Sequence, residues 1–414
     1  MKSSVVTVIY NVLEGLCLLV GLAVPAATSW VFIALTGRVS DFPEYYAAAK
    51  LASSGHAPAA YISNEIGQVQ HQLFAGMGER IVGFYMPPPA LMLIAPLTLF
   101  PAGVASYVWI GLLLSSTGLM AFLLKKFWQQ TKQEFAIFWI FALLSGPLYE
   151  GFRLGQPAAL FSLSLTLALF FWRKERNWLA ALCLLPFGMK PHFLIMVTAF
   201  LAGGRRYRPA LYMAVVLLIL AIASVVFFGV DSFTSYFASL KTNINSQNDV
   251  VAAMSANLNP TLRGQLLRIP RLDPNIIMAT GVVFMLVCFG INFFLGKKFE
   301  KNESFLELLA VSAIPATIIS ALHCHDYDLL ILAPAVVSMQ KLSRSTQYVN
   351  GTLIPATLIL AALYCLPSFL YFHYTWLLRD SQIINPFFFA MLFFNGSIVY
   401  SLFKAKPAQP VGDE

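Results

Sequence analysis

The stretch that decides the fold is PALYMAVVLLILAIASVVFFG, residues 209–229, which carries no charged side chain. Its length matches the ~20 apolar residues that a helix needs to cross the hydrocarbon core of a bilayer. Similar runs recur from one end of the chain to the other and leave no stretch for a sizeable water-soluble core. The sequence therefore predicts an all-α, polytopic integral membrane protein with a single membrane domain over residues 1–414.

The composition agrees with a membrane protein and excludes most soluble classes. Hydrophobic residues make up 58% of the chain and charged residues 11%, against about 25% charged residues in a soluble domain, and the mean hydropathy is +0.71. The net charge is +8, but its basic residues stand in short clusters between apolar runs, which is typical of cytoplasmic loops. No basic patch is interleaved with aromatic residues in a soluble segment, so we expect no nucleic-acid partner.

The basic clusters orient the chain if they lie in the cytoplasm. They predict membrane segments near 8–36, 103–124, 134–149, 156–172, 178–189, 191–203, 209–229, 275–296, 305–322, 327–341, 351–371 and 384–403. Twelve crossings would put both chain ends inside. The apolar stretch 87–100 begins with three prolines, which favours a re-entrant or partial helix; if it crosses, the count is 13.

Two of these segments are too short to span the membrane alone. At 1.5 Å per residue, 178–189 and 191–203 each reach about 18 Å, against ~30 Å of hydrocarbon. Their shared tip, Met189-Lys190-Pro191-His192, must then lie within the depth of the membrane, where protein or a water-filled cavity has to surround it. The segments before and after residues 149–156 predict a second shallow hairpin.

Two longer segments are predicted outside. Residues 37–86 form the first outer loop, with short juxtamembrane helices over Asp41 to Ser54 and Ile62 to Phe74; the second of these is amphipathic and suited to the interface plane. Residues 229–273 form the second large outer loop, which is rich in Asn, Ser and Gln and holds the motif from Asn257 to Gly264.

Under this topology many polar side chains share the outer side, and ionisable groups near hydrocarbon are functional candidates by default. They are Asp41, Arg153, Gln156, Lys190, His192, Arg263, His323, His325, Asp326 and Asp328. Asp41 has two open interpretations, the cap of the following helix or a carboxylate that accepts a proton from a substrate hydroxyl. Lys190 either extends to the headgroups or holds an anionic phosphate, and Arg153 is a second candidate for that phosphate.

The turn His323-Cys324-His325-Asp326-Tyr327-Asp328 contains residue types that bind metals, but adjacent residues in one turn rarely converge on an ion. Hydrogen bonding to a phosphate or sugar, or a plain polar turn, are the other interpretations, and we predict no metal site. Tyr45, Tyr46, Tyr85 and Trp109 fall where an aromatic belt is expected in any case. No Gly-rich phosphate loop, Cys-x-x-Cys pair or Gly-x-Ser-x-Gly elbow is present, which argues against nucleotide, zinc and serine-hydrolase chemistry.

Taken together and in order, the motifs resemble glycosyltransferase family 87, polyprenyl-phosphate-dependent enzymes of the GT-C class. The similarity covers roughly residues 40–340, and the segment from Asn257 to Gly264 matches only approximately. The motifs are Asp41-Phe42-Pro43-Glu44-Tyr45-Tyr46-Ala47-Ala48 with Gly55 and Tyr61, Tyr85-Met86-Pro87-Pro88 with Ala95-Pro96-Leu97, Gly155-Gln156, Lys190-Pro191 and the turn from His323 to Asp328.

The resemblance implies an inverting transfer of a hexose, typically mannose, from a polyprenyl-phosphate donor to a lipid or glycan acceptor. It places the reaction on the outer or periplasmic side of the inner (plasma) membrane, and it implies no nucleotide sugar, cofactor or obligatory metal. Asp41 would be the general base, and Lys190, His323 and Arg153 would hold the donor phosphate. The remaining substrate-binding candidates are Tyr45, Tyr46, Tyr85, Gln156, His192, Asn259, Arg263, His325 and Asp326.

Two other functions compete with this interpretation. A multi-pass transporter of a polar or anionic solute also uses broken helices, but carriers usually show paired repeats with corresponding breaks, and the breaks here do not recur. A lipid-diphosphate-dependent oligosaccharide polymerase or ligase would be expected to need more arginines in its large outer loop than Arg263, Arg268 and Arg271.

Overall fold

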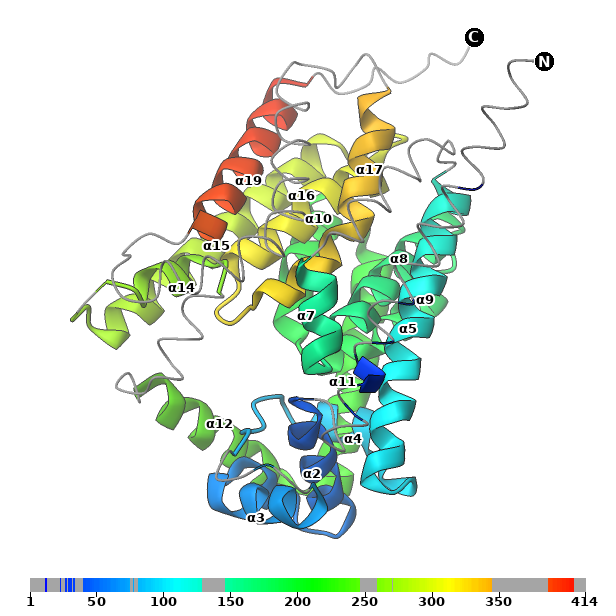
Figure 1. Cartoon of the computed structure of the whole chain (residues 1–414). Coiled ribbons are helices and arrows are strands. Elements are labelled where there is room, and N and C mark those ends of the chain that lie inside the picture. Colours follow the sequence, from blue (N-terminus) through cyan, green and yellow to red (C-terminus); the bar gives the residue numbers. More distant parts are fainter. Residues whose placement is uncertain are drawn as a thin grey trace.

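A computed structural model describes residues 40–74, 77, 81–128, 146–245, 259–269, 271–344 and 386–405, with isolated positions between 12 and 33 (Figure 1). Every regular element within this part of the chain is a helix, which confirms the predicted all-α class. The predicted segment 351–371, and most of 8–36 and 134–149, lie outside the described residues.

Three helices are long and apolar enough to cross a membrane, and they are α5 (Ala102–Phe127), α11 (Tyr207–Phe228) and α15 (Pro274–Lys298). Each matches a predicted segment to within three residues. The helices α7 (Gly146–Leu154) and α8 (Ala158–Arg173) pass the same test together but meet at an angle of 119°. The chain is therefore a polytopic membrane protein, and the total of 12 or 13 crossings stays a prediction.

The remaining helices are shorter. The segment predicted as the first outer loop forms α2 (Phe42–Ser53), η1 (Ala57–Tyr61) and α3 (Ser63–Leu73), close to the two helices predicted there. Behind them, α4 (Pro89–Ile94) and η2 (Ala95–Leu99) form the partial helix predicted over 87–100. The others are α9 (Asn177–Cys183), η3 (Leu185–Gly188), η4 (Pro191–Leu194), α10 (Ile195–Gly203), α16 (Phe305–Ser320), η5 (Asp326–Leu332), α17 (Ala333–Ser343) and α19 (Pro386–Lys404).

The helix break at Lys190 is observed where it was predicted. Lys190 has φ −140° and ψ 68°, outside the helical region, and stands between the two 3-10 turns η3 and η4. Pro186 and Pro191 lie at the starts of these turns, where a missing N–H costs no helical hydrogen bond. The short helices α9 and α10 therefore meet at a non-helical tip.

The second predicted hairpin is displaced toward the C-terminus. We expected its tip over residues 149–156, but α7 continues to Leu154 and the chain turns at Gly155, whose φ is +75°. Glycine adopts this left-handed conformation without the strain of a Cβ, and it ends the helix there. The Gln156 N–H then donates to the Gly151 carbonyl over 2.7 Å and closes the turn.

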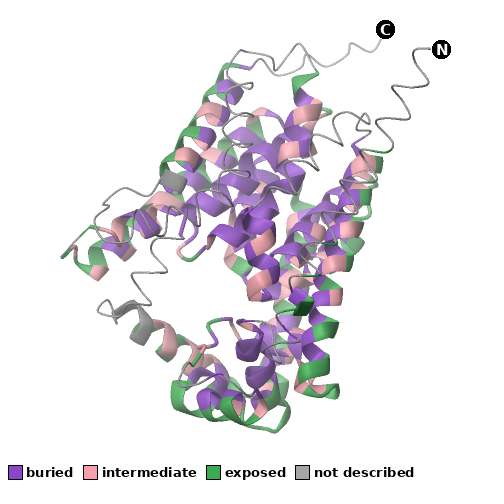
Figure 2. Cartoon of the chain, in the orientation of Figure 1, coloured by how far each residue is buried: buried purple, intermediate pink, exposed green. Residues whose placement is uncertain are grey.

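The segment predicted as the second large outer loop contains two helices, α12 (Val230–Asn245) and α14 (Leu262–Leu266). Helix α12 follows α11 directly after Gly229 and packs against η1, with the rings of Tyr236 and Tyr61 5.7 Å apart. Figure 1 shows α2, α3 and α12 together at one end of the molecule. Buried residues are concentrated in the bundle that contains α10, α16 and α17 (Figure 2).

Basic residues that lie far apart in the sequence come together at two places in the structure. Glu307 on α16, whose side chain is 1% exposed, pairs with Arg173 at the end of α8 and with Lys341 on α17, the latter over 2.7 Å. Lys298 at the end of α15 donates to the carbonyls of Leu402 and Phe403 in the last turn of α19. The end of α8 thus lies beside α17, and the end of α15 lies beside the end of α19.

The closest helix contact joins α10 and α15 through glycines. A methyl group added at Gly203 would lie 1.9 Å from the Phe293 carbonyl oxygen, and one added at Gly296 would lie 2.1 Å from the Phe200 carbonyl oxygen. Small residues let helix backbones approach one another in membranes, where van der Waals packing drives association. This contact holds α10 in place and with it the tip at Lys190.

We predict that Gly296→Ala lowers the thermal unfolding midpoint of the purified protein by several degrees, because overpacking costs about 1–3 kcal/mol. Gly290→Ala on the same helix is the matched control, since a methyl group there meets no atom within 4 Å. Unfolding followed by tryptophan fluorescence in detergent measures both. Equal midpoints for the two variants would contradict the close contact.

Candidate functional site

Asp41 is the N-cap residue of α2, as the capping interpretation predicted, but its side chain makes no capping hydrogen bond to that helix. Its carboxylate is directed to other partners. One carboxylate oxygen accepts a hydrogen bond from Gln156 Nε2 over 3.2 Å, and the other accepts one from Ser40 Oγ over 3.2 Å. The Asp41 N–H donates to the Leu154 carbonyl over 3.0 Å, so the corner between α7 and α8 fixes the position of this carboxylate.

Gln156 connects the carboxylate to the aromatic side chains of α2. Its side-chain oxygen accepts a hydrogen bond from the Tyr45 hydroxyl over 2.5 Å, and both residues are buried. The Trp109 indole N–H donates to the Gly155 carbonyl over 2.7 Å, and its ring lies 5.8 Å from that of Tyr45. Tyr45 and Trp109 thus belong to the protein interior rather than to a lipid-facing aromatic belt.

Tyr46 does not join this group. Its hydroxyl donates to the Phe100 carbonyl over 2.7 Å, which ties α2 to the end of η2. The hydrogen bond of Tyr46 therefore joins two elements of the fold, whereas that of Tyr45 is made to Gln156 beside Asp41.

Lys190 is 6% exposed, and its ammonium group donates to both carboxylate oxygens of Asp328, over 2.8 and 2.7 Å. It does not extend to the membrane surface, so that interpretation is wrong. Asp328 is fully buried, and its Oδ2 also accepts a hydrogen bond from the His325 N–H over 3.0 Å. The rings of Phe193 and Tyr327 lie 5.4 and 5.3 Å from the ammonium nitrogen.

The histidines gather around this ion pair. His192 Nε2 lies 3.1 Å from the His323 carbonyl oxygen, and the rings of His323 and His325 are 4.7 Å apart. His325 also stacks on Tyr327 at 5.1 Å. Burial and the Lys190 ammonium lower the pKa of His325 to about 4, so its ring is neutral at pH 7.

Helix α14 reaches the same turn through Arg263, whose Nη1 donates to the Leu322 carbonyl over 3.0 Å. Asn259 is almost fully buried, and its side-chain oxygen accepts from the Thr261 N–H over 3.2 Å at the start of α14. Arg263 thus approaches the histidines, whereas the side chain of Asn259 shapes the turn before α14.

Arg153 binds a carboxylate of its own helix. Its Nε and Nη2 donate to Glu150, with the shortest distance 2.6 Å, and the Arg153 side chain is 40% exposed. Nearby, Asp326 is buried, and burial together with the Glu150 carboxylate raises its pKa to about 7. Arg153 and Asp326 form a third polar group with Glu150.

Tyr327 connects these groups. Its side chain interacts electrostatically with Asp41, Glu44, Asp326 and Asp328, and its ring lies 5.3 Å from the Lys190 ammonium nitrogen. The Asp41 group and the Lys190–Asp328 pair are therefore both close to this tyrosine, although they come from residues 40–45, the α9–α10 tip and the turn before α17. We treat the carboxylate and the buried ammonium as parts of one candidate site.

Tyr85 is 47% exposed and interacts electrostatically with Glu44. Burial of part of its ring and the Glu44 carboxylate raise its pKa. The segment that carries Tyr85 is fixed by Gln70, whose amide exchanges hydrogen bonds of 2.6 and 3.0 Å with the backbone of Val82. The Tyr61 hydroxyl donates to the Met86 carbonyl over 3.1 Å and fixes its other end.

Glu44, Glu150 and Tyr327 were not among the predicted site residues, and Asp328 was named as a candidate without an assigned role. Two of them carry a local signal: Asp328 follows His325 by three residues and forms a capping box with it, and Glu150 precedes Arg153 by three residues on one helix. Tyr327 and Glu44 carry no signal beyond their positions in the motifs.

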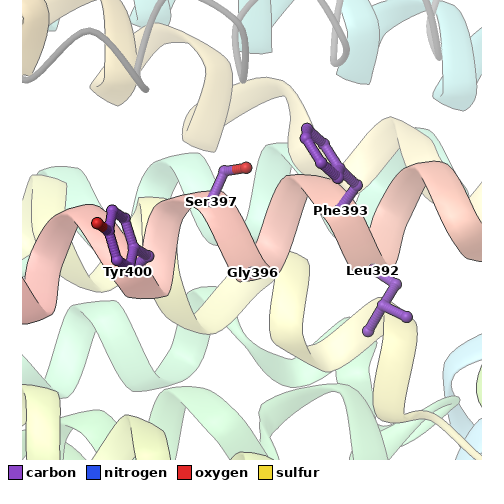
Figure 3. A pocket seen from close by; sticks show the side chains of 5 residues that line it. All are labelled: Leu392, Phe393, Gly396, Ser397 and Tyr400. Carbon is purple, nitrogen blue, oxygen red and sulfur yellow. The ribbon is translucent and has the colours of Figure 1, made fainter.

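Neither a metal site nor the apolar pocket coincides with these groups. Within the described ranges, no cluster of three or more His, Cys, Asp or Glu side chains could hold a metal ion. A pocket on α19 is lined by Leu392, Phe393, Gly396, Ser397 and Tyr400 (Figure 3). None of the polar site residues lies among them.

We predict that Asp326→Asn stabilises the protein more at pH 8 than at pH 5. Folding raises the pKa of the Asp326 carboxyl from about 3.9 to about 7, so the charged form is less favourable in the folded protein than in the unfolded one. The stability that the protonated carboxyl provides at low pH is therefore lost as the pH rises through this range. Asn stays neutral and still offers an oxygen to the Tyr327 N–H, which Asp326 binds over 2.9 Å. Unfolding midpoints of both proteins at the two pH values measure the effect, and a pH-independent difference would contradict it.

Comparison with known proteins gives one match. Residues 84–321 match the family model of glycosyltransferase family 87. No curated protein and no solved structure matches the chain. The matched range contains α7, the α9–α10 tip and α14, and it covers more than half of the chain. The chain belongs to glycosyltransferase family 87 and is a membrane glycosyltransferase.

Proposed function

We propose that the protein transfers a hexose, mannose being the expected sugar, from a polyprenyl-phosphate donor to a hydroxyl group of a lipid or glycan acceptor. The observation that carries this proposal is that the Asp41 carboxylate and the Lys190 ammonium both lie near Tyr327. An inverting transfer needs a base on one face of the sugar and a stabilised leaving group on the other. We assign the first task to Asp41 and the second to Lys190.

Asp41 is the proposed general base. Its carboxylate is partly exposed, makes no capping bond and is positioned by the amide of Gln156, which Tyr45 holds in turn. A positioned carboxylate removes the proton of the attacking hydroxyl as the new glycosidic bond forms. Tyr85, which is exposed, and the buried Glu44, which interacts with it electrostatically, are the proposed contacts to the acceptor.

Lys190 is the proposed ligand of the donor phosphate. A lipid donor approaches from the bilayer, so its phosphate must meet a cation near membrane depth, and the α9–α10 break supplies one. Negative charge grows on the phosphate as the glycosidic bond breaks, and a fixed ammonium stabilises that charge. His192, His323 and the neutral His325 add hydrogen-bonding groups, while Arg153, already bound to Glu150, is a lesser candidate.

The arrangement of the basic clusters supports a site on the outer side of the plasma membrane. Arg173 and Lys341 converge on Glu307, and Lys298 reaches the end of α19 beside Lys404, as expected if these clusters share the cytoplasmic side. The site residues lie in other segments, at the opposite ends of their helices. The site would then face the outside or periplasm.

We expect Asp41→Asn to lower the turnover of sugar transfer about 10²–10⁴-fold, the contribution of a general base. Purified protein in nanodiscs, labelled polyprenyl-phosphate mannose and a panel of lipid and glycan acceptors provide the assay. Glu65→Gln, an exposed acid on α3, is the control and should keep full activity. Unchanged turnover in Asp41→Asn would contradict its role as base.

The same assay separates the competing functions. A lipid-diphosphate oligosaccharide offered as donor should give no transfer; transfer from that donor alone would favour the polymerase or ligase. Membership of a glycosyltransferase family argues against the transporter as the main activity. Uptake of a solute into reconstituted vesicles without any sugar transfer would instead favour the transporter hypothesis.

We expect Lys190→Gln to raise the donor KM about 10- to 100-fold, because a hydrogen bond to a charged group contributes about 1.5–3 kcal/mol. The double variant Lys190→Gln/Asp328→Asn avoids an uncompensated buried carboxylate and should show the same loss. Lys50→Gln on α2, where the lysine is exposed, is the control. A donor KM that stays at the wild-type value in the double variant would rule out Lys190 as the phosphate ligand.

A further inference from the structure

The ammonium group of Lys190 is already neutralised by a carboxylate within the protein. Asp328 is fully buried and contacts it with both oxygens, at 2.8 and 2.7 Å. The His325 N–H fixes Asp328 Oδ2 over 3.0 Å, so the carboxylate keeps its place even if Lys190 turns toward another anion. A phosphate that binds here must therefore share the ammonium with Asp328.

The other groups around the ammonium do not replace this negative charge. The side chains that interact with it are His192 from η4 and His323, Cys324 and His325 from the turn, and Arg263 from α14 faces His323. None of these carries a negative charge when the thiol is protonated, and burial raises the pKa of the Cys324 thiol well above its usual range. The other carboxylates of the site, Asp326, Asp41 and Glu44, interact electrostatically with Tyr327.

The donor and the product of the proposed reaction differ in charge. A polyprenyl-phosphate sugar is a phosphodiester with one negative charge, whereas the released polyprenyl monophosphate carries about −1.5 to −2 at pH 7. Lys190 alone would therefore hold the product more tightly than the donor. A fixed carboxylate beside the ammonium repels the more highly charged product more strongly, because Coulomb energies scale with charge.

We propose that Asp328 is a positioning residue that holds the Lys190 ammonium in the empty site and competes with the lipid phosphate for it, so that the product phosphate leaves after transfer. This inference rests on the proposed function, in which Lys190 binds the donor phosphate. Asp328 touches neither the sugar nor the acceptor, and it acts only through Lys190.

The decisive variant is Asp328→Asn, which keeps the size of the side chain and an oxygen for the His325 N–H. We expect the inhibition constant of polyprenyl monophosphate to fall about tenfold or more, because an unscreened cation then faces a near-dianion. The donor KM should fall less, and turnover should become limited by release, with a burst of transferred sugar in the first cycle. If the substitution instead damaged the site in general, both the monophosphate and the donor would bind more weakly and no burst would be seen.

A second measurement compares two ligands, first in the wild-type protein and then in Asp328→Asn. Wild-type protein should bind a short-chain polyprenyl phosphate and its monoanionic methyl ester with affinities within about threefold of each other, because Asp328 offsets the extra charge. Asp328→Asn should prefer the monophosphate about tenfold or more. Asp231→Asn, an exposed acid on α12, is the control and should behave as wild type.

The outcomes separate the two proposals. If wild type transfers sugar from the polyprenyl-phosphate donor but already prefers the monophosphate tenfold, or if Asp328→Asn weakens its binding, the role of Asp328 is overturned. If wild type neither transfers sugar from that donor nor binds the monophosphate, the proposed function itself fails. If Asp328→Asn does not fold, the wild-type comparison of the two ligands decides the inference alone.

Discussion

The ion pair between Lys190 and Asp328 is the interaction on which the arrangement of the site depends. An ammonium group within a mostly apolar helix bundle needs a counter-charge, because burying an unpaired ion costs several kcal/mol. Asp328 supplies the counter-charge from a turn 138 residues further along the chain. The pair therefore fixes the α9–α10 tip against the start of η5. Tyr327 contacts the ammonium with its ring and also interacts electrostatically with Asp41.

The long helices could be predicted from the sequence because their lengths follow from the thickness of the bilayer. Helix α11 was expected over 209–229 and extends over Tyr207–Phe228, and α15 was expected over 275–296 and extends over Pro274–Lys298. The break at Lys190 was also predictable, since Pro191 follows it. Helix α12 was missed because its polar composition resembles a loop, and its partner Tyr61 lies far away in the sequence.

The site was predicted by residue type but not by partner. Asp41, Gln156 and Lys190 were identified as candidates, yet the sequence does not show that Gln156 positions Asp41 or that Asp328 closes on Lys190, because these pairs are 115 and 138 residues apart. Aromatic residues were the least predictable. Tyr45 and Tyr46 are neighbours in the sequence, but on a helix they face different directions, so one reaches Gln156 and the other reaches Phe100.

The site contains two aspartates whose surroundings fit them for opposite tasks. Asp41 is partly exposed at the edge of the site, and the amide of Gln156 and the hydroxyl of Ser40 donate to it. Asp328 is fully buried and shares its charge with an ammonium and a backbone N–H. A substrate hydroxyl can reach a partly exposed carboxylate, whereas a fully buried one bound to an ammonium is closed to it. The environment, and not the residue type, therefore distinguishes the proposed base Asp41 from Asp328, which balances the charge of Lys190.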